Sequence, residues 1–546
     1  MEFFKDRIII FASSSRLLIL ILQVVANSLL PDHDAGVFSP PTDKNSFTWL
    51  DHMVHFFFGG LHRWDAVYFT HIMQYGYSYE NCAAFFPCFP IVVSTLARIL
   101  STLGILHLSS WLLVTGVVLN YFVFVATVFL LFQLGKSILR DEEVSYYACL
   151  FFCINPASIF MSAIYSETLF AFFNILAMLE LHRKRIYWAS LYFGLAVFTR
   201  SNGIVSIGFV LHTVIKSLLN DLYFNHKTSH RERKLNQAFN YLLLLKKTAV
   251  ELGISLSICF LPFCLYQYYI YRQFCLQSDK LNFLPTYIVD YGRDQGYKLI
   301  GDQPSPWCNA TLPLSYSYIQ KHHWNVGFLS YYELKQLPNF MLALPIIILS
   351  VRSCLYFFGL NKKLFYGLGF CDKVEGDQSV SRPGEVINED CVNTTVYTRV
   401  KDKQKMARDS HSDIKVSSEI VVLVFHLASL LLFGCFFMHI QVLTRLLCSS
   451  SPLLYWYVSV LYLGTSGHRT TEGTSVNCDS NIHQNKTGFN LPRAIVYILR
   501  AFKLNFIIIV FNKWHSSLLE FKCYYIYFLT YCVVGTVMFS NFLPWT

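Results

Sequence analysis

Residues 108–135 contain no charged side chain, and similar apolar blocks recur along the whole chain of 546 residues. A helix needs about 20 apolar residues to cross the hydrocarbon core of a bilayer. Only 14% of the residues are charged and 54% are hydrophobic, whereas soluble domains carry about 25% charged residues. The sequence therefore predicts an all-α polytopic membrane protein.

Clusters of Lys and Arg lie between the apolar blocks, and their positions predict the topology. These clusters fall in 136–140, 183–185, 216–247 and 361–418. Basic residues prefer the cytosolic side of a membrane, which predicts about eleven transmembrane helices. The expected luminal segments are 31–107, 163–167, about 199–203, 272–337 and 438–449. The net charge of +10 is then a topology signal and requires no nucleic acid.

The first apolar block, Ile8–Leu30, is expected to remain as an uncleaved signal anchor, because no small-residue cleavage site precedes Pro31. Arg16 within it is expected to snorkel toward the cytosolic face. The run Phe85–Leu106 is expected to lie on the luminal surface or to dip into the membrane. A full crossing there would invert every later assignment.

Three regions follow from this map. Residues 1–360 are expected to form the catalytic membrane core, with 31–107 as its first luminal loop. Residues 361–418 are rich in charged and polar side chains and are expected to be a disordered cytosolic insertion. Residues 419–546 are expected to form a C-terminal transmembrane region, in which 450–520 alternates ambiguously between apolar and polar residues.

Two apolar segments are too short to cross a bilayer alone. Ile186–Thr199 and Ile204–Ile215 are joined by Arg200, Ser201, Asn202 and Gly203. Irregular backbone inside a membrane survives only where it lines a polar cavity or is buried in protein. Arg200 is therefore expected to face a site, the alternative being a structural ion pair with a carboxylate of a neighbouring helix.

Asp65 lies between aromatic residues in the first predicted luminal loop. A carboxylate beside a membrane is energetically unfavourable, which makes it a functional candidate. The alternative roles are a helix N-cap or an ion-pair partner for Arg63.

Further polar residues in the predicted luminal positions complete the set of candidates. With Asp65 as catalytic residue, the substrate-binding candidates are Trp64, Asp32, Glu167, Tyr165, Arg200, Asn202, His439 and Arg445. One carboxylate base, a second acid and several cations fit transfer from a phosphate-linked donor. The base takes a hydroxyl proton, and arginine offsets the charge on the departing phosphate.

The cysteines and glycosylation sequons add local expectations. The sixteen cysteines show no C-x-x-C spacing, which argues against a zinc site, and no other metal-ligand cluster is expected. Cys275 and Cys308 flank one predicted luminal loop and could form a disulfide. Sequons occur at Asn309, Asn393 and Asn485, but only Asn309 lies on the predicted luminal side.

Motifs spread over nearly the whole chain resemble one known family. They are Leu-Pro-Asp-His at 30–33, Phe-Ser-Pro-Pro at 38–41, Trp-Asp-Ala at 64–66, Phe-Phe-Pro at 85–87, Tyr-Ser-Glu at 165–167, Arg-Ser-Asn-Gly at 200–203, Leu-Pro-Phe at 261–263, Tyr-Ser-Tyr-Ile-Gln at 316–320, Trp-Asn-Val-Gly-Phe-Leu at 324–329, Tyr-Tyr-Glu-Leu-Lys-Gln at 331–336, His-Ile-Gln-Val-Leu-Thr-Arg at 439–445 and Asn-Phe-Leu-Pro-Trp-Thr at 541–546. The chain is similar to the phosphatidylinositol-glycan class V family of mannosyltransferases. It departs from the family in 361–418 and 464–514.

The resemblance implies a GT-C-like helix bundle in the endoplasmic reticulum membrane, multi-pass, with luminal catalytic loops. The implied reaction transfers the second mannose, in α-1,6 linkage, from dolichol-phosphate-mannose to a mannosyl-glucosaminyl-phosphatidylinositol acceptor. Asp65 would be the base of a single inverting displacement. No cofactor or metal is implied beyond the lipid-linked donor. Membrane lipids are the expected surroundings, and the need for a small membrane partner subunit stays open.

Two other classes of function compete with an enzyme. Broken helices also mark transport sites, which favours a transporter or lipid flippase, but no internal repeat relates the two halves of the sequence. A non-catalytic subunit is the second alternative. Such a subunit would tolerate loss of Asp65, whereas a transferase would not.

Overall fold

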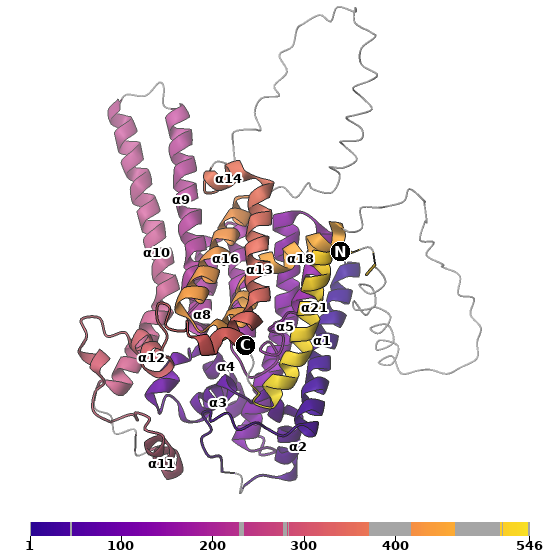
Figure 1. The fold of residues 1–546 in the computed structure, drawn as a ribbon. Coiled ribbons are helices and arrows are strands. Elements are labelled where there is room, and N and C mark those ends of the chain that lie inside the picture. Colours follow the sequence, from indigo (N-terminus) through magenta and orange to yellow (C-terminus); the bar gives the residue numbers. More distant parts are fainter. Residues whose placement is uncertain are drawn as a thin grey trace, which may run out of the picture.

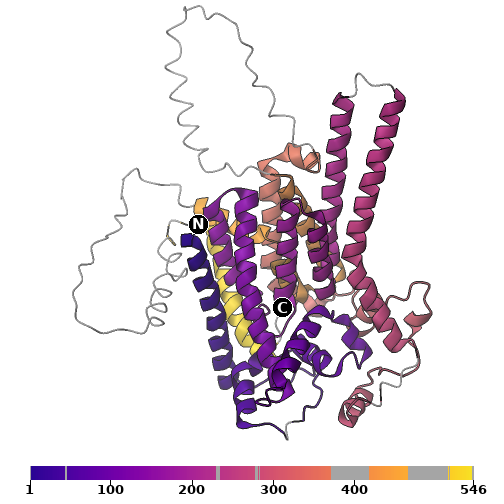
Figure 2. The same cartoon turned by 180° about the vertical axis from the view of Figure 1, so that it is seen from behind.

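The structure, a computed structural model, describes residues 2–43, 46–228, 234–276, 281, 283–370, 417–464, 514–515 and 517–543. Within these ranges the chain is helical and contains no named strand. Long helices stand side by side as a bundle, and shorter helices cover one of its ends (Figures 1 and 2). The structure thus confirms the predicted all-α polytopic membrane class.

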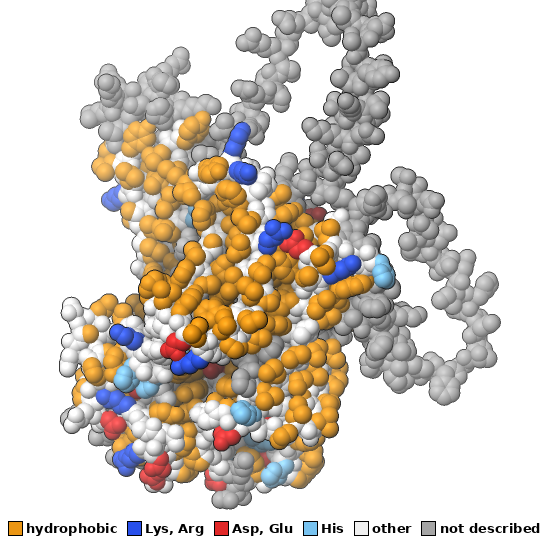
Figure 3. All heavy atoms as spheres, viewed as in Figure 1, with side chains coloured by type: hydrophobic (Ala, Val, Ile, Leu, Met, Phe, Trp, Pro, Cys, Tyr) orange, Lys and Arg blue, Asp and Glu red, His pale blue; other side chains and the backbone are white. Residues whose placement is uncertain are grey.

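Seven helices of the described chain are long and apolar enough to cross a membrane. They are α1 (Glu2–Leu29), α5 (Leu108–Leu139), α9 (Gly203–Thr228), α10 (Lys234–Phe274), α13 (Leu337–Leu360), α16 (Ser418–Phe437) and α21 (Leu519–Ser540). Hydrophobic side chains cover most of the bundle face seen in Figure 3. Such a surface is expected where helices meet lipid.

The count rises to eight if one bent pair is a single broken span, in which η7 (Ile440–Val442) and α17 (Leu443–Ser450) meet α18 (Leu453–Gly464) at 75°. The other three expected crossings coincide with the shorter helices α6 (Glu142–Cys153), α7 (Glu167–His182) and α8 (Ile186–Thr199). The count of eleven remains a prediction. The end of α8 at Thr199 is as expected, but α9 continues to Thr228, so the prediction of a second short helix over 204–215 is wrong. The residues after 215 are more polar. They continue the same helix because a helix can extend beyond the hydrocarbon core of the membrane, where polar side chains meet water.

The chain between α6 and α7 is irregular and lies deep in the bundle. Pro156 lacks a backbone N–H, so it cannot continue a helix. The Asn155 side chain donates to the carbonyl of Phe152 at 2.7 Å. Asn120 of α5 donates from Nδ2 to the carbonyls of Ala163 and Tyr165, at 2.6 and 3.0 Å. These bonds satisfy backbone groups that the broken helix leaves unpaired.

Arg16 holds the same irregular segment, which overturns its predicted snorkelling. Its side chain is buried in the bundle and donates to the carbonyls of Cys153 and Ser158 and to the Ser162 hydroxyl. Its guanidinium also lies 3.9 Å from the centroid of the Phe124 ring. The carbonyls freed by the helix break accept hydrogen bonds from the Arg16 guanidinium inside the protein. This charged group therefore need not reach the membrane surface.

The two long segments predicted to be luminal lie at one end of the bundle, away from the N-terminus (Figure 1). The first segment, 31–107, carries α2 (Trp49–Phe58), η1 (Gly59–Leu61), α3 (Asp65–Tyr75), η2 (Glu80–Ala84) and α4 (Cys88–Ser101). The second segment, 272–337, carries α11 (Thr286–Asp294), η5 (Pro306–Asn309), α12 (Ser315–Trp324) and η6 (Leu334–Gln336). Helix α4 packs against α3 and α5. With only 14 residues, it fits the expectation that Phe85–Leu106 makes no full crossing.

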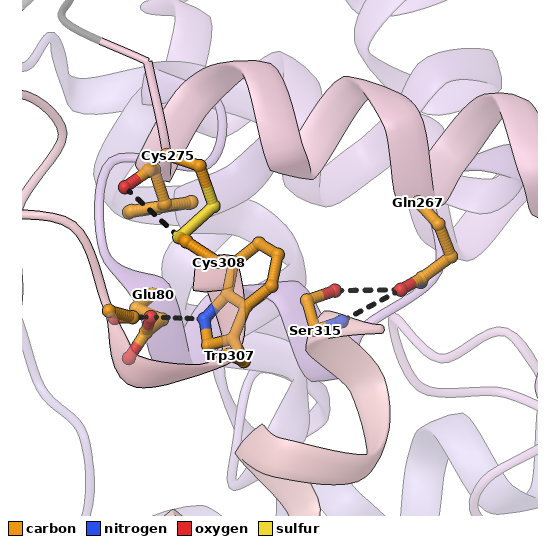
Figure 4. Close-up of a disulfide and its surroundings, with 8 residues drawn as sticks. Glu80, Gln267, Cys275, Trp307, Cys308 and Ser315 are labelled. Atoms are coloured by element: carbon orange, nitrogen blue, oxygen red, sulfur yellow. Dashed lines mark hydrogen bonds between the residues drawn. A yellow bond between two sulfur atoms is a disulfide. The ribbon is translucent and has the colours of Figure 1, made fainter. Parts of the chain in front are cut away.

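A buried carboxylate of the first segment joins it to the second, next to a disulfide within the second segment (Figure 4). The predicted Cys275–Cys308 disulfide is present. Next to it, Trp307 donates from Nε1 to Glu80 Oε1 at 2.8 Å, and the Ser305 hydroxyl donates to the same oxygen. Burial raises the pKa of Glu80, but these hydrogen bonds and His323 outweigh it and leave the pKa below its usual value. The fastened segments therefore form one cover over this end of the bundle.

The structure describes only the two ends of the predicted insertion at 361–418. Residues 362–366 form the short helix α14 (Lys362–Tyr366), and α16 already begins at Ser418. The remaining part, 371–416, lies outside the described residues, as does 465–513 within the ambiguous 450–520 stretch.

Candidate active site

Asp65 is the first residue of α3, where the helix dipole favours a negative charge. The preceding residue, Trp64, has a φ of 55°, which bulky side chains rarely adopt. The Tyr165 hydroxyl accepts the Asp65 backbone N–H at 3.0 Å and donates to the Arg63 carbonyl at 3.4 Å. Tyr165 therefore fixes the backbone on both sides of Trp64, and with it the start of α3.

Asp65 belongs to a continuous network of four charged side chains. Asp65 Oδ2 is 2.6 Å from Arg445 Nη1, which in turn is 3.7 Å from Glu167 Oε1. Glu167 Oε1 is also 2.5 Å from Arg200 Nη1. The Glu167 side chain is fully buried, and each arginine side chain is only 16% exposed. Two carboxylates thus hold two arginines together in a site with no net charge.

A cavity of about 160 Å³ opens beside this network, and we call it the reaction cavity. Its polar lining comes from Asp65, Ser166, Arg200, Ser201, Tyr316, Gln320, Trp324, His439 and Arg445. Its apolar lining includes Phe69, Phe85, Phe86, Val326, Met438 and Val442. A carboxylate and two guanidiniums beside apolar walls suit a substrate that joins a sugar phosphate to a lipid.

Helix α12 closes one side of the reaction cavity. Tyr316, Gln320 and Trp324 are spaced by four residues, so they share one helix face, and all three line the cavity. The Tyr316 hydroxyl donates to the Ser201 hydroxyl at 2.7 Å, which ties α12 to the break between α8 and α9. Tyr316 and Gln320 were not among the predicted candidates, although their spacing would have placed them on one face with Trp324.

His439 belongs to the same cavity. Its ring stacks on Tyr331 with centroids 4.6 Å apart. Burial lowers the pKa of His439 below its ordinary value. The imidazole is therefore uncharged at neutral pH, and it can hydrogen-bond a sugar hydroxyl without adding a third cation.

A family model described as Mannosyltransferase (PIG-V) matches residues 5–546. The chain belongs to this family. GPI alpha-1,6-mannosyltransferase 2 of Cricetulus griseus is 36% identical over 544 residues, and the alignment covers 99% of each chain. The Homo sapiens protein of that name is 35% identical over 543 residues, again with 99% of each covered. GPI mannosyltransferase 2 of Drosophila melanogaster is 31% identical over 550 residues, covering 99% of this chain and all of the relative.

In this family member, the network brings together four candidates named from the sequence. Asp65, Glu167, Arg200 and Arg445 are in ion-pair contact, and Tyr165 positions Asp65. Asp65 is neither an N-cap nor the partner of Arg63, which were its alternative roles. Arg200 combines both roles considered for it, because it pairs with Glu167 and also lines the reaction cavity.

Three candidates lie elsewhere. Asn202 donates to the Ser450 hydroxyl at 3.0 Å, joining the α8–α9 break to α17. Trp64 packs on Phe542, with ring centroids 5.9 Å apart. Asp32 pairs with Arg63 at 2.9 Å and lines a different cavity. Among the described residues, no group of three or more His, Cys, Asp or Glu side chains could hold a metal ion.

Proposed function

We propose that this chain transfers the second mannose of the glycosylphosphatidylinositol anchor. The donor is dolichol-phosphate-mannose and the acceptor is mannosyl-glucosaminyl-phosphatidylinositol, joined by an α-1,6 linkage. The observation that carries the proposal is the pairing of Asp65 with Arg445 at the reaction cavity, in a chain whose full-length relatives are named GPI alpha-1,6-mannosyltransferase 2. We place the reaction at the luminal face of the endoplasmic reticulum membrane.

The reaction is one displacement at C1 of the donor mannose. The 6-hydroxyl oxygen of the acceptor mannose bonds to C1, and the bond from C1 to the phosphate oxygen breaks. Asp65 takes the hydroxyl proton, and dolichyl phosphate leaves with the bonding electrons. The donor is β-linked and the product α-linked, so a single inversion suffices, with no covalent enzyme intermediate and no cofactor.

Arg445 and Arg200 are the residues proposed to meet the leaving phosphate. Both line the reaction cavity, and a guanidinium can donate two parallel hydrogen bonds to a phosphate. Glu167 lies within contact of both, so it keeps the two like charges together before the donor arrives. The need for a small partner subunit stays a prediction.

The lipid that accumulates in cells without the protein tests the function. We expect a glycosylphosphatidylinositol precursor that carries one mannose, separated by chromatography and sized by mass spectrometry. Accumulation of a precursor with no mannose, or with two, would contradict the proposed step. A transporter or flippase would instead leave the normal precursor on the wrong face of the membrane.

Replacing Arg200 tests the phosphate role. Lys keeps the charge but loses the planar fork, so Arg200→Lys should raise the donor KM about tenfold and Arg200→Ala about a hundredfold, as expected for losing one or two charge-assisted hydrogen bonds. Steady-state kinetics on folded, monodisperse protein measures this. If the donor KM and kcat of Arg200→Ala match those of the wild type, Arg200 only serves the ion pair with Glu167.

Glycosylation of Asn309 tests the luminal placement. Asn309 is exposed, next to the disulfide, whereas Asn393 and Asn485 lie outside the described residues and are predicted to be cytosolic. Endoglycosidase should remove the mass of one glycan from the wild type and none from Asn309→Gln. A glycan on Asn393 would place 361–418 in the lumen and overturn the topology.

A further inference from the structure

A second cavity, of about 360 Å³, lies on the opposite face of α3 from Asp65. Asp65 and Phe69 of α3 line the reaction cavity, whereas Val67, Thr70, His71 and Gln74 line the second one. The latter four follow the i, i+3, i+4, i+7 spacing of one helix face. With 3.6 residues per turn, Val67 and Phe69 point about 160° apart. A single helix therefore separates the two cavities.

The second cavity is lined mainly by hydrogen-bonding side chains. Besides those of α3, its polar lining includes Asp32, Ser39, Thr42, His55, His62, Arg63 and Ser109. His71 Nε2 shares a hydrogen bond with the Ser78 hydroxyl at 2.6 Å, while its Nδ1, buried and in a residue only 3% exposed, has no hydrogen-bond partner among the described residues. Buried polar atoms without a partner are rare in proteins, and this one belongs to a residue that lines the second cavity.

The charges at this cavity cancel. Arg63 is held by Asp32 at 2.9 Å and by Asn27 at 2.8 Å. Burial lowers the pKa of both His62 and His71 to about 3, with Arg63 adding to the effect on His62. Both imidazoles are thus neutral and can each donate and accept a hydrogen bond. A neutral lining of donors and acceptors suits hydroxyl groups better than a phosphate.

Family motifs that the catalytic site does not use meet at this cavity. Asp32 comes from the motif at 30–33, Ser39 from the motif at 38–41, and Phe542 from the motif at 541–546. Residues 541 and 542 lie next to the first loop, since the Asn541 carbonyl accepts the His33 N–H at 2.9 Å and the Phe542 ring centroid lies 4.7 Å from the Arg63 guanidinium. Two neighbouring parts of the first loop and one remote C-terminal segment thus meet in the wall of this cavity.

We propose that the second cavity binds a hydroxylated ring of the glycolipid acceptor, the inositol or the hexosamine that stands behind the reacting mannose. This rests on the proposed function, which supplies such an acceptor. Arg63, in the wall of the second cavity, is only two residues before Asp65, so an acceptor that passes the N-terminus of α3 reaches both cavities. The cavity then selects acceptors by their inner rings, while the reaction cavity handles the transferred mannose.

Two substitutions test this with the purified full-length chain. Gln74→Leu removes one hydrogen-bonding group from the wall, and Ser39→Trp fills the cavity mouth. Gln295→Leu and Ser28→Trp are the matched controls, because both positions are exposed and neither lines the reaction cavity or the second cavity. Each protein is assayed with mannosyl-glucosaminyl-phosphatidylinositol and, separately, with methyl α-mannoside, which carries no inner ring.

The readout is the ratio of kcat/KM for the full acceptor to kcat/KM for methyl α-mannoside. We expect this ratio to fall about tenfold in Gln74→Leu, the loss of one hydrogen bond in a buried site, and further in Ser39→Trp, while both controls keep the wild-type ratio. A general folding defect lowers both rates together and leaves the ratio unchanged. An unchanged ratio in both cavity variants would overturn the proposal. Failure of the wild type to use either acceptor would instead overturn the proposed function.

Discussion

Asp65→Asn is expected to abolish mannose transfer while the protein is made at normal levels. Asn has nearly the same shape and can keep a hydrogen bond from Arg445, but it cannot take up the acceptor proton. A general base contributes about 10²–10⁴ in rate, so kcat should fall by that factor. The test is rescue of anchored surface proteins in cells that lack the enzyme, together with in vitro turnover.

Asp34→Asn is the matched control for this substitution. Asp34 is exposed in the same loop, and its one hydrogen bond within the described ranges is a local one from the Gly36 backbone N–H at 3.2 Å. It should rescue fully. Full rescue by Asp65→Asn as well would remove Asp65 from the mechanism and would favour a non-catalytic role for the chain.

Glu167→Gln is expected to weaken both the fold and the reaction. Glu167 is fully buried and contacts both Arg200 and Arg445. Without its charge, Arg200 loses this ion-pair partner, and Arg445 keeps its pair with Asp65. Breaking a buried ion pair on one side lowers the free energy of unfolding by about 3–5 kcal/mol. Thermal unfolding in detergent should show a clearly lower Tm. The protein that remains folded should transfer mannose more slowly than the wild type.

Glu333→Gln is the matched control, because it removes a carboxylate at a site away from the Glu167 network. Glu333 pairs with Lys335, but its side chain is 46% exposed, and exposed pairs contribute about 0–1 kcal/mol. Its Tm and activity should stay near the wild type. Equal behaviour of the two variants would mean that Glu167 does not hold the arginines together.

The sequence was sufficient to predict the helical membrane class and much of the site. Hydrophobic blocks and charge bias depend only on local composition, which is why the long helices and the shared end of 31–107 and 272–337 could be predicted. Glu167 and Arg200 could be predicted because each stands at a helix break, where backbone inside a membrane needs a polar environment.

Pairing between distant residues could not be predicted from spacing. Arg16 was expected at the membrane surface. The sequence of α1 does not show that the carbonyls of Cys153 and Ser158, far away in the chain, accept its hydrogen bonds. Asp32 was a substrate-binding candidate, yet it pairs with Arg63, which stands directly before the unusual backbone of Trp64. Glu80 was not singled out, because its partner Trp307 is fixed by the packing of a remote segment.

The most direct test of the central claim is transfer by the purified chain. Given dolichol-phosphate-mannose and mannosyl-glucosaminyl-phosphatidylinositol in a defined bilayer, the protein should form one product that carries a second mannose. Linkage analysis by permethylation should find that mannose attached α to the 6-position of the first. A mannose at another position, or no transfer by folded protein under conditions in which cell membranes containing it are active, would contradict the account.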